Sequence, residues 1–207
     1  MDVTDTAQSI QEAVAEEAAA ERERAAVRDR FRQRGALAVA ELAMLLAISA
    51  VGGGNATKNM LSANIQASDT YAFYQAKTVR QTSLRLAQEQ LELLLPTLPP
   101  EQQAAARARI EEYRATVARY ESEPQTGEGK KELLEKATQY VRQRDRAQQQ
   151  DPNFDFSQAL FQIAIVLGSV SIVAVSGRVL ALALGLGTIA AFLMLNGFLL
   201  LLDLPIG

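Results

Sequence analysis

One carboxylate stands inside an otherwise apolar stretch of this sequence. Glu41 follows the start of residues 35–54 by about six positions, or roughly 9 Å along a helix. An ionisable side chain in a segment of membrane-spanning length is costly, and by default it is a candidate for an ion or proton path. Two structural alternatives stay open: an ion pair with Arg178, or extension of the side chain toward Arg34 and the lipid headgroups. No series of acids crosses the apolar stretches, which argues against a proton pump.

A second group of polar and aromatic residues follows this stretch closely. Asp69, Tyr71, Tyr74, Gln75 and Lys77 belong to one expected helix, at a height just above the membrane. Tyr71, Tyr74 and Gln75 fall nearly on one face of it, whereas Asp69 does not. Tyrosines at this height can pack against headgroups, against another part of the chain or against a neighbour. We favour a packing role over a ligand site, and we expect any functional site to lie here.

Composition removes most catalytic chemistry. The 207 residues include no Cys, no His and no Trp, and the formal net charge is −3. Without Cys there is no thiol nucleophile or thiolate metal site, and without His the usual general base and commonest metal ligand are missing. Phosphate-binding and dinucleotide-binding glycine motifs are also absent, because Gly52, Gly53 and Gly54 end an apolar helix with no strand before them. We therefore expect a non-enzymatic protein with no catalytic residues, cofactor, metal or nucleic-acid partner.

The elements that must position these residues are helices. Three apolar stretches each approach the roughly 20 residues that cross a bilayer, and a long charged segment separates the first two. We predict an all-α membrane protein with three transmembrane helices and a long extramembrane helical hairpin between the first and second. Its predicted parts are a charged cytoplasmic helix (1–34), a first span (35–54), a helical stalk (55–156), a second span (157–175), a cytoplasmic turn (176–178), a third span (179–202) and an extracytoplasmic tail (203–207).

Charge sets the expected orientation. Six arginines lie between residues 22 and 34, before the first span, whereas Lys58 is the only base close behind it. Arg178 occupies the short turn between the second and third spans. The positive-inside rule then places the N-terminus in the cytoplasm and residues 55–156 in the periplasm.

The stalk carries a heptad pattern. Five apolar residues recur every seventh position, as in a coiled coil, at Ile65, Ala72, Val79, Leu86 and Leu93. Polar residues alternate with them, at Ser68, Gln75, Thr82 and Glu89. This alternation suits a looser bundle, or a helix wrapped by other parts of the same chain, better than a dry dimer.

Prolines divide the rest of the stalk. Pro96, Pro99 and Pro100 end the long helix, and Pro100 can begin the next one. Residues 124–129 interrupt the return, and Pro152 is expected to stop the helix before the second span. The lengths predict one long helix out and two shorter helices back.

Small residues form rows in two spans. In the first span they alternate steps of four and three, at Ala36, Ala40, Ala43, Ala47, Ala50 and Gly54. A similar row in the third span comprises Ala183, Gly187, Ala190 and Gly197. Such rows allow close helix approach in a membrane, within one chain or between chains. Asn196 and Gln162 are expected to form hydrogen bonds between helices.

The string IQASDTYAFYQAKTVR at residues 65–80 resembles the signature of a bacterial membrane-protein family recorded as domain of unknown function 4337. The early span, the segment Phe161–Leu167 and the pair Asn196-Gly197 are similar to that family too. The resemblance implies the three-span plan and a bacterial inner-membrane location, and it implies no activity.

Two hypotheses follow from the sequence. The first is a self-associating scaffold or accessory subunit of a membrane complex, with membrane lipid, copies of itself and possible further membrane proteins as partners. The alternative is a homo-oligomeric channel or transport component whose polar path is lined by Glu41 and the polar layers of the stalk.

Overall fold

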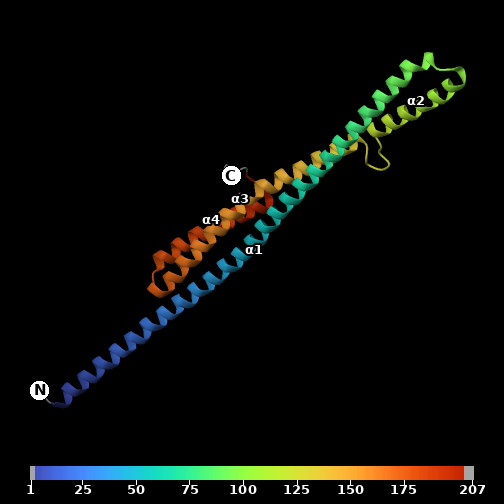
Figure 1. The fold of residues 1–207 in the computed structure, drawn as a ribbon. Helices are drawn as coiled ribbons and strands as arrows, with labels where there is room; N and C mark the ends of the chain where they lie inside the picture. Colours follow the sequence, from blue (N-terminus) through green and yellow to red (C-terminus); the bar gives the residue numbers. More distant parts are fainter. Residues whose placement is uncertain (1–2, 203–207) are drawn as a thin grey trace. The chain divides into compact units, whose positions relative to one another are not determined.

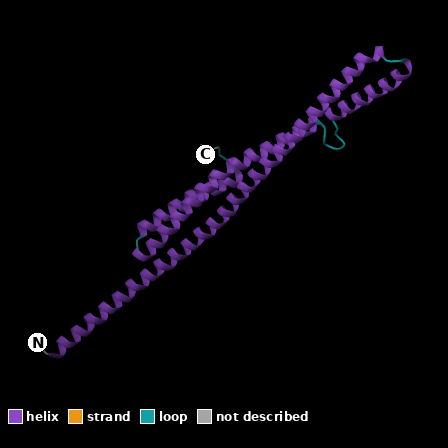
Figure 2. Cartoon of the chain, viewed as in Figure 1, coloured by secondary structure: helices purple, strands orange, loops and turns teal. Residues whose placement is uncertain are grey.

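The chain folds as helices throughout its described part (Figures 1 and 2). The computed structural model describes the backbone of residues 3–202 and the side chains from residue 16 onward. The predicted tail at residues 203–207 lies outside this range. Four α-helices and one 3₁₀ turn occur in chain order: α1 (Val3–Leu94), η1 (Leu95–Thr97), α2 (Pro100–Glu121), α3 (Lys130–Ala174) and α4 (Gly177–Leu199).

The first element is longer than predicted. Residues 1–34, the first span and the outgoing stalk were given separate boundaries, but α1 is one helix of 92 residues. No proline occurs before Pro96 to remove a backbone donor. The glycines at 52–54 weaken helix propensity without ending the helix. The expectation that the span continues into the stalk without a joint is confirmed.

Three helices contain a segment that is long and apolar enough to cross a membrane; these are α1, α3 and α4. The chain divides into two compact units, each described separately below. The first unit comprises Met1–Asn55 with Gln149–Gly207, and the second comprises Ala56–Gln148.

The first unit is a three-helix arrangement of α1, α3 and α4. Its interior contains few large side chains other than Phe154 and Phe161, which are 1% and 0% exposed. The Phe154 ring fills space left by glycines on neighbouring helices. A Cβ atom at Gly52 would lie 2.5 Å from the Phe154 ring, and one at Gly197 would lie 2.9 Å from it. Phe154 also meets Phe198 edge to face, with ring centroids 4.8 Å apart.

The second unit is an out-and-back helical hairpin. Pro100 begins α2, as predicted, and α2 lies beside the end of α1 (Figure 1). Pairs such as Glu92 with Arg114 and Gln81 with Glu121 show that the two helices run antiparallel. The return limb breaks between Glu121 and Lys130, close to the predicted interruption.

The prediction that Pro152 stops a helix was wrong, because α3 continues through it to Ala174. The missing N–H removes one backbone bond, but the next two side chains hold the helical backbone in place. Asn153 and Phe154 are 3% and 1% exposed, and the Asn153 side-chain amide also donates to the Gln149 carbonyl at 3.0 Å. Tertiary packing therefore overrides the local signal.

Candidate functional site

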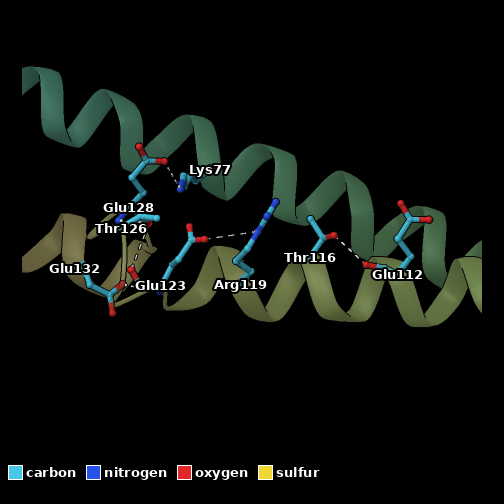
Figure 3. Close-up of polar contacts among 8 residues, drawn as sticks. All are labelled: Lys77, Glu112, Thr116, Arg119, Glu123, Thr126, Glu128 and Glu132. Atoms are coloured by element: carbon cyan, nitrogen blue, oxygen red, sulfur yellow. Dashed lines mark hydrogen bonds and ion pairs between the residues drawn. The ribbon is translucent and has the colours of Figure 1, made fainter.

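The most buried charge in the described part of the second unit belongs to the signature string. Lys77 is 4% exposed, although a lysine is rarely buried without partners. Its Nζ lies 5.0 Å from the centroid of the Phe73 ring and 5.5 Å from that of Tyr120, and 3.5 Å from Glu128 Oε2. Figure 3 shows Lys77 extending from α1 toward Glu128. Two aromatic faces and one carboxylate thus replace the water that the ammonium loses.

Gln81 is the next inward-facing residue of α1, and it is 2% exposed. Its amide nitrogen donates to the Val117 carbonyl at 3.1 Å and to Glu121 Oε2 at 3.0 Å. Its amide oxygen accepts a hydrogen bond from Lys130 Nζ at 2.9 Å. One side chain therefore joins α1 to the end of α2 and the beginning of α3.

Lys130 completes this group. Its Nζ lies 3.6 Å from Glu121 Oε2 and 5.5 Å from the centroid of the Tyr74 ring. The Gln81 hydrogen bond and the charge of Lys130 lower the pKa of Glu121, and partial desolvation opposes this effect. We call the set Lys77, Gln81, Glu121, Glu128 and Lys130 the lysine clamp.

The connection between α2 and α3 is fixed at its base as well. Glu132 accepts hydrogen bonds from the Ser122 hydroxyl at 2.6 Å and from the Glu123 backbone N–H at 3.1 Å (Figure 3 draws Glu123 and Glu132). The Ser122 bond is the main cause that lowers the pKa of Glu132. A side chain at Gly129 would collide with the Glu132 carboxylate and the backbone of Ser122 and Glu123. The base of the loop therefore requires a glycine at position 129.

The clamp holds structure and offers little chemistry. Glu121 is paired with Gln81 and Lys130, Glu128 is paired with Lys77, and no cluster of three or more metal-ligating side chains occurs among the described residues. An open hollow of about 350 Å³ lies beside it, lined by Asp69, Thr70, Phe73, Thr126, Gly127, Glu128, Leu133 and Lys136. Acids and a base share this lining, so it favours no ligand charge.

The structure brings together only part of the predicted group. Lys77 belongs to the clamp and Tyr74 packs against its Lys130, whereas Asp69, Tyr71 and Gln75 are exposed. Sequence reasoning missed Gln81, Glu121 and Lys130. The signal was present in the inward row Tyr74, Lys77 and Gln81, whose steps of three and four match one helical face, but its polar side chains did not suggest a core.

In the first unit, neutral hydrogen bonds join the three helices. Ser49 Oγ donates to Ser157 Oγ at 3.1 Å, and Ser157 Oγ donates to the Ala190 carbonyl at 2.9 Å. Asn196 donates to Asn153 Oδ1 at 2.8 Å, so its expected bond between helices is confirmed. Gln162 is exposed instead.

Asn196 also fixes the segment that follows α4. Its side-chain amide donates to the Leu202 carbonyl at 3.0 Å, and its oxygen accepts from the Leu202 N–H at 2.9 Å. The chain turns here through Leu200 at φ 49°. One buried amide therefore links α4 to α3 and holds the turn after α4.

Glu41 and Arg178 do not meet. Both side chains are exposed, and none of the ion pairs between described side chains involves either residue. The proposed buried pair is therefore not formed in this chain. An outward-facing Glu41 leaves two of the three original alternatives, extension toward the headgroups and a polar path.

The two rows of small residues differ in burial. Ala183, Gly187, Ala190 and Gly197 are buried, and a side chain at Gly187 would meet Leu42 of α1. The row in α1 is exposed along its length, at Ala36, Ala40, Ala43, Ala47, Ala50 and Gly54. The helix instead turns Gly35, Leu42, Ser49, Gly52 and Gly53 inward.

The sequence was also compared with known proteins. A family model described as Domain of unknown function (DUF4337) matches residues 31–200, which is most of the chain. Comparison with curated proteins and with solved structures finds no match.

Proposed function

Because the chain belongs to the DUF4337 family, which carries no activity to transfer, we propose its function from its own geometry: an integral membrane protein that self-associates and serves as a scaffold or accessory subunit of a membrane complex. The observation that carries this proposal is the outer surface of the first unit. Every one of its three helices exposes large apolar side chains.

Examples come from each helix. Met44 and Val51 of α1 are 60% and 65% exposed, Val173 of α3 is 81% exposed, and Leu182 of α4 is 57% exposed. Water-soluble proteins rarely expose apolar surface this continuously. In a bilayer these apolar side chains would contact lipid tails and not water, so membrane lipid is the first partner that we propose. We place the protein in the bacterial inner membrane, with its N-terminus in the cytoplasm and residues 55–156 in the periplasm.

A scaffold role fits the lysine clamp. The buried polar side chains of the second unit hold one loop and two helices together, and the described residues contain no group of three metal-ligating side chains. A rigid rod can present a surface to other proteins of the envelope without chemistry of its own.

Stoichiometry tests the proposal most directly. We expect native mass spectrometry in mild detergent to give one defined oligomer, or a complex with another membrane protein copurified from native membranes. A strictly monomeric protein without a partner would contradict it. Because the chain has no Cys, single-cysteine variants at Arg34 and Lys58 can report orientation. An impermeant thiol reagent added to whole spheroplasts should label Lys58→Cys and spare Arg34→Cys.

The exposed Glu41 favours a second candidate, a homo-oligomeric channel. In that arrangement Glu41 and the polar layers Ser68, Gln75, Thr82 and Glu89, all exposed in one chain, would face a water-filled path between copies. Reconstituted protein should then conduct ions, and Glu41→Gln should change the conductance. Liposomes that stay silent with both proteins would remove the channel from consideration.

A further inference from the structure

The second unit leaves one complete heptad face of α1 without a partner in its own chain. Ile65, Val79, Leu86 and Leu93 are 52%, 67%, 55% and 79% exposed, and Ala72 between them is exposed too. We call these five residues, with Ser68, Gln75, Thr82 and Glu89, the outward heptad face. Of the two arrangements that the heptad pattern suited, wrapping of this seam by other parts of the same chain does not occur, because its residues are exposed.

The return limb covers the opposite face. Ala63, Ala67, Lys77 and Gln81 are between 2% and 4% exposed, and Tyr74 lies among them over Lys130. These residues also recur in steps of three, four and seven, so α1 carries two heptad faces on nearly opposite sides. The hairpin uses one of them. On the other face, a seven-residue spacing stabilises nothing while the face contacts solvent. The spacing matches a second helix that has the same spacing.

We propose that the outward heptad face packs against the same face of a second copy of this chain, with the two α1 helices parallel and in register. This inference deepens the proposed self-association and rests on it. Copies inserted in one membrane share one orientation, so identical segments of the stalk stand at the same height. In that register Ile65 meets Ile65 of the other copy, and each later layer repeats the match.

The residues flanking the face are compatible with this pairing. In a parallel pair the neighbours across the seam are Asn64 with Asp69, Tyr71 with Ala76, Thr78 with Ser83, and Arg85 with Gln90. None of these four pairs brings like charges together. A flanking pattern of this kind does not repel an identical chain.

The polar layers set the character of the contact. Two Gln75 amides can hydrogen-bond to each other across the axis, and a buried polar layer fixes register at a cost in stability. Two Glu89 carboxylates in the last polar layer repel, which keeps the association weak and reversible. The variant Glu89→Gln should therefore tighten the oligomer, and Val79→Asp should dissociate it.

The absence of Cys makes the test direct. Single-cysteine variants Ile65→Cys, Val79→Cys and Leu86→Cys, each in full-length protein in native membranes, are treated with copper phenanthroline and run without reductant. Arg80→Cys is the matched control, because Arg80 is exposed beside Val79 but points away from the seam. Disulfides need Cβ atoms about 4 Å apart, so we expect roughly tenfold more covalent dimer from the three seam variants than from the control.

The outcomes separate this inference from the proposed function. An oligomer by native mass spectrometry, with crosslinking at all three seam positions, supports both. An oligomer in which Val79→Cys crosslinks no better than Arg80→Cys overturns the outward heptad face and leaves self-association standing. Crosslinking at Val79→Cys alone overturns the parallel register, since an antiparallel pair can join like positions at only one layer. A monomer overturns both.

Discussion

The two units solve the same packing problem with different chemistry. In the first, the inward face of α1 consists of glycines, a leucine and a serine, and helices approach closely around Phe154. In the second, the inward face of the same helix includes a lysine and a glutamine, which hold their neighbours by charge and hydrogen bonds. The change occurs without any break in the helix.

The proposed membrane location accounts for the difference, because each unit would then meet a different solvent. A bilayer supplies no hydrophobic drive between helices, so close contact and a few neutral hydrogen bonds must suffice. Water rewards apolar burial but tolerates ions, so the second unit can bury a lysine where aromatic rings and a carboxylate replace its hydration. The contrast is thus an argument for where the membrane lies. Four experiments test it.

The largest expected effect is at the close contact of the first unit. Gly52→Val adds atoms where a Cβ alone would stand 2.8 Å from Phe198 and closer still to Phe154. Phe154 is 1% exposed and has little room to move, so we expect a loss of about 3 kcal/mol in unfolding free energy. Thermal unfolding in detergent, followed by circular dichroism, measures it.

The same glycine run provides the control for this experiment. A Cβ atom at Gly54 meets no heavy atom within 4 Å. The unfolding free energy of Gly54→Val, measured on monodisperse protein, should therefore lie within about 0.5 kcal/mol of the wild-type value. Equal losses from the two variants would show that helix propensity, and not close packing, governs this unit.

The next effect belongs to the lysine clamp. Lys77→Ala removes two cation–π contacts and a buried aliphatic stem. This change should lower the unfolding free energy by about 2 kcal/mol. Amide exchange in residues 122–130 should accelerate at the same time, because Glu128 loses its ion pair. Lys77→Met keeps the stem and should lose about half as much.

Lys58→Ala is the matched surface control, since Lys58 lies on the same helix with an exposed side chain. It should leave both stability and loop exchange unchanged. If Lys77→Ala behaves like Lys58→Ala, the polar interior of the second unit contributes nothing and the contrast between the units fails.

Much of the fold could be predicted from the sequence, because the signals were local. The apolar lengths, the prolines at 96–100 and the break near residues 124–129 are read directly from residue types, and α2 does begin at Pro100. Pro152 was misjudged because its helix is held by the burial of Asn153 and Phe154, which no local pattern reveals.

The candidate site was only half predictable. The signature string led to Tyr74 and Lys77, but Tyr120, the partner of Lys77, lies 43 residues later in the chain, and Lys130, the partner of Tyr74, lies 56 residues later. The heptad rule selected the apolar face of α1 as the seam, whereas the chain buries the face that contains Lys77 and Gln81. The rule that the buried face of a helix is its apolar face fails where buried charged and amide side chains form hydrogen bonds and ion pairs with one another.

A smaller effect is expected at the buried amide of the first unit. Asn196→Leu leaves Asn153 Oδ1 without its donor and the Leu202 N–H without its acceptor. Hydrogen bonds between membrane helices contribute modestly, so we expect a loss of about 1 kcal/mol. Gln162→Leu, at an exposed position of α3, should be neutral. A larger loss than at Lys77 would mean that the first unit depends on polar contacts more than its packing indicates.

The smallest expected effect is a difference between the two units in how their amide protection depends on pH. The pKa values of Glu121 and Glu132 are lowered in the folded chain, chiefly by the hydrogen bonds from Gln81 and Ser122. A carboxyl group with a lowered folded pKa contributes its stability above its ordinary pKa, and that contribution is lost as the pH falls through the lowered value. Acidification below about pH 4 should therefore reduce amide protection at residues 122–130, after correction for intrinsic exchange rates. Glu132→Gln should already exchange faster at neutral pH and change less on acidification.

The helices of the first unit, joined by the neutral Ser49, Ser157, Asn153 and Asn196 side chains, should keep their protection over the same range. Equal acid sensitivity in both units would show that ionised groups stabilise the apolar unit as well, and the distinction between a bilayer-facing and a water-facing interior would no longer hold.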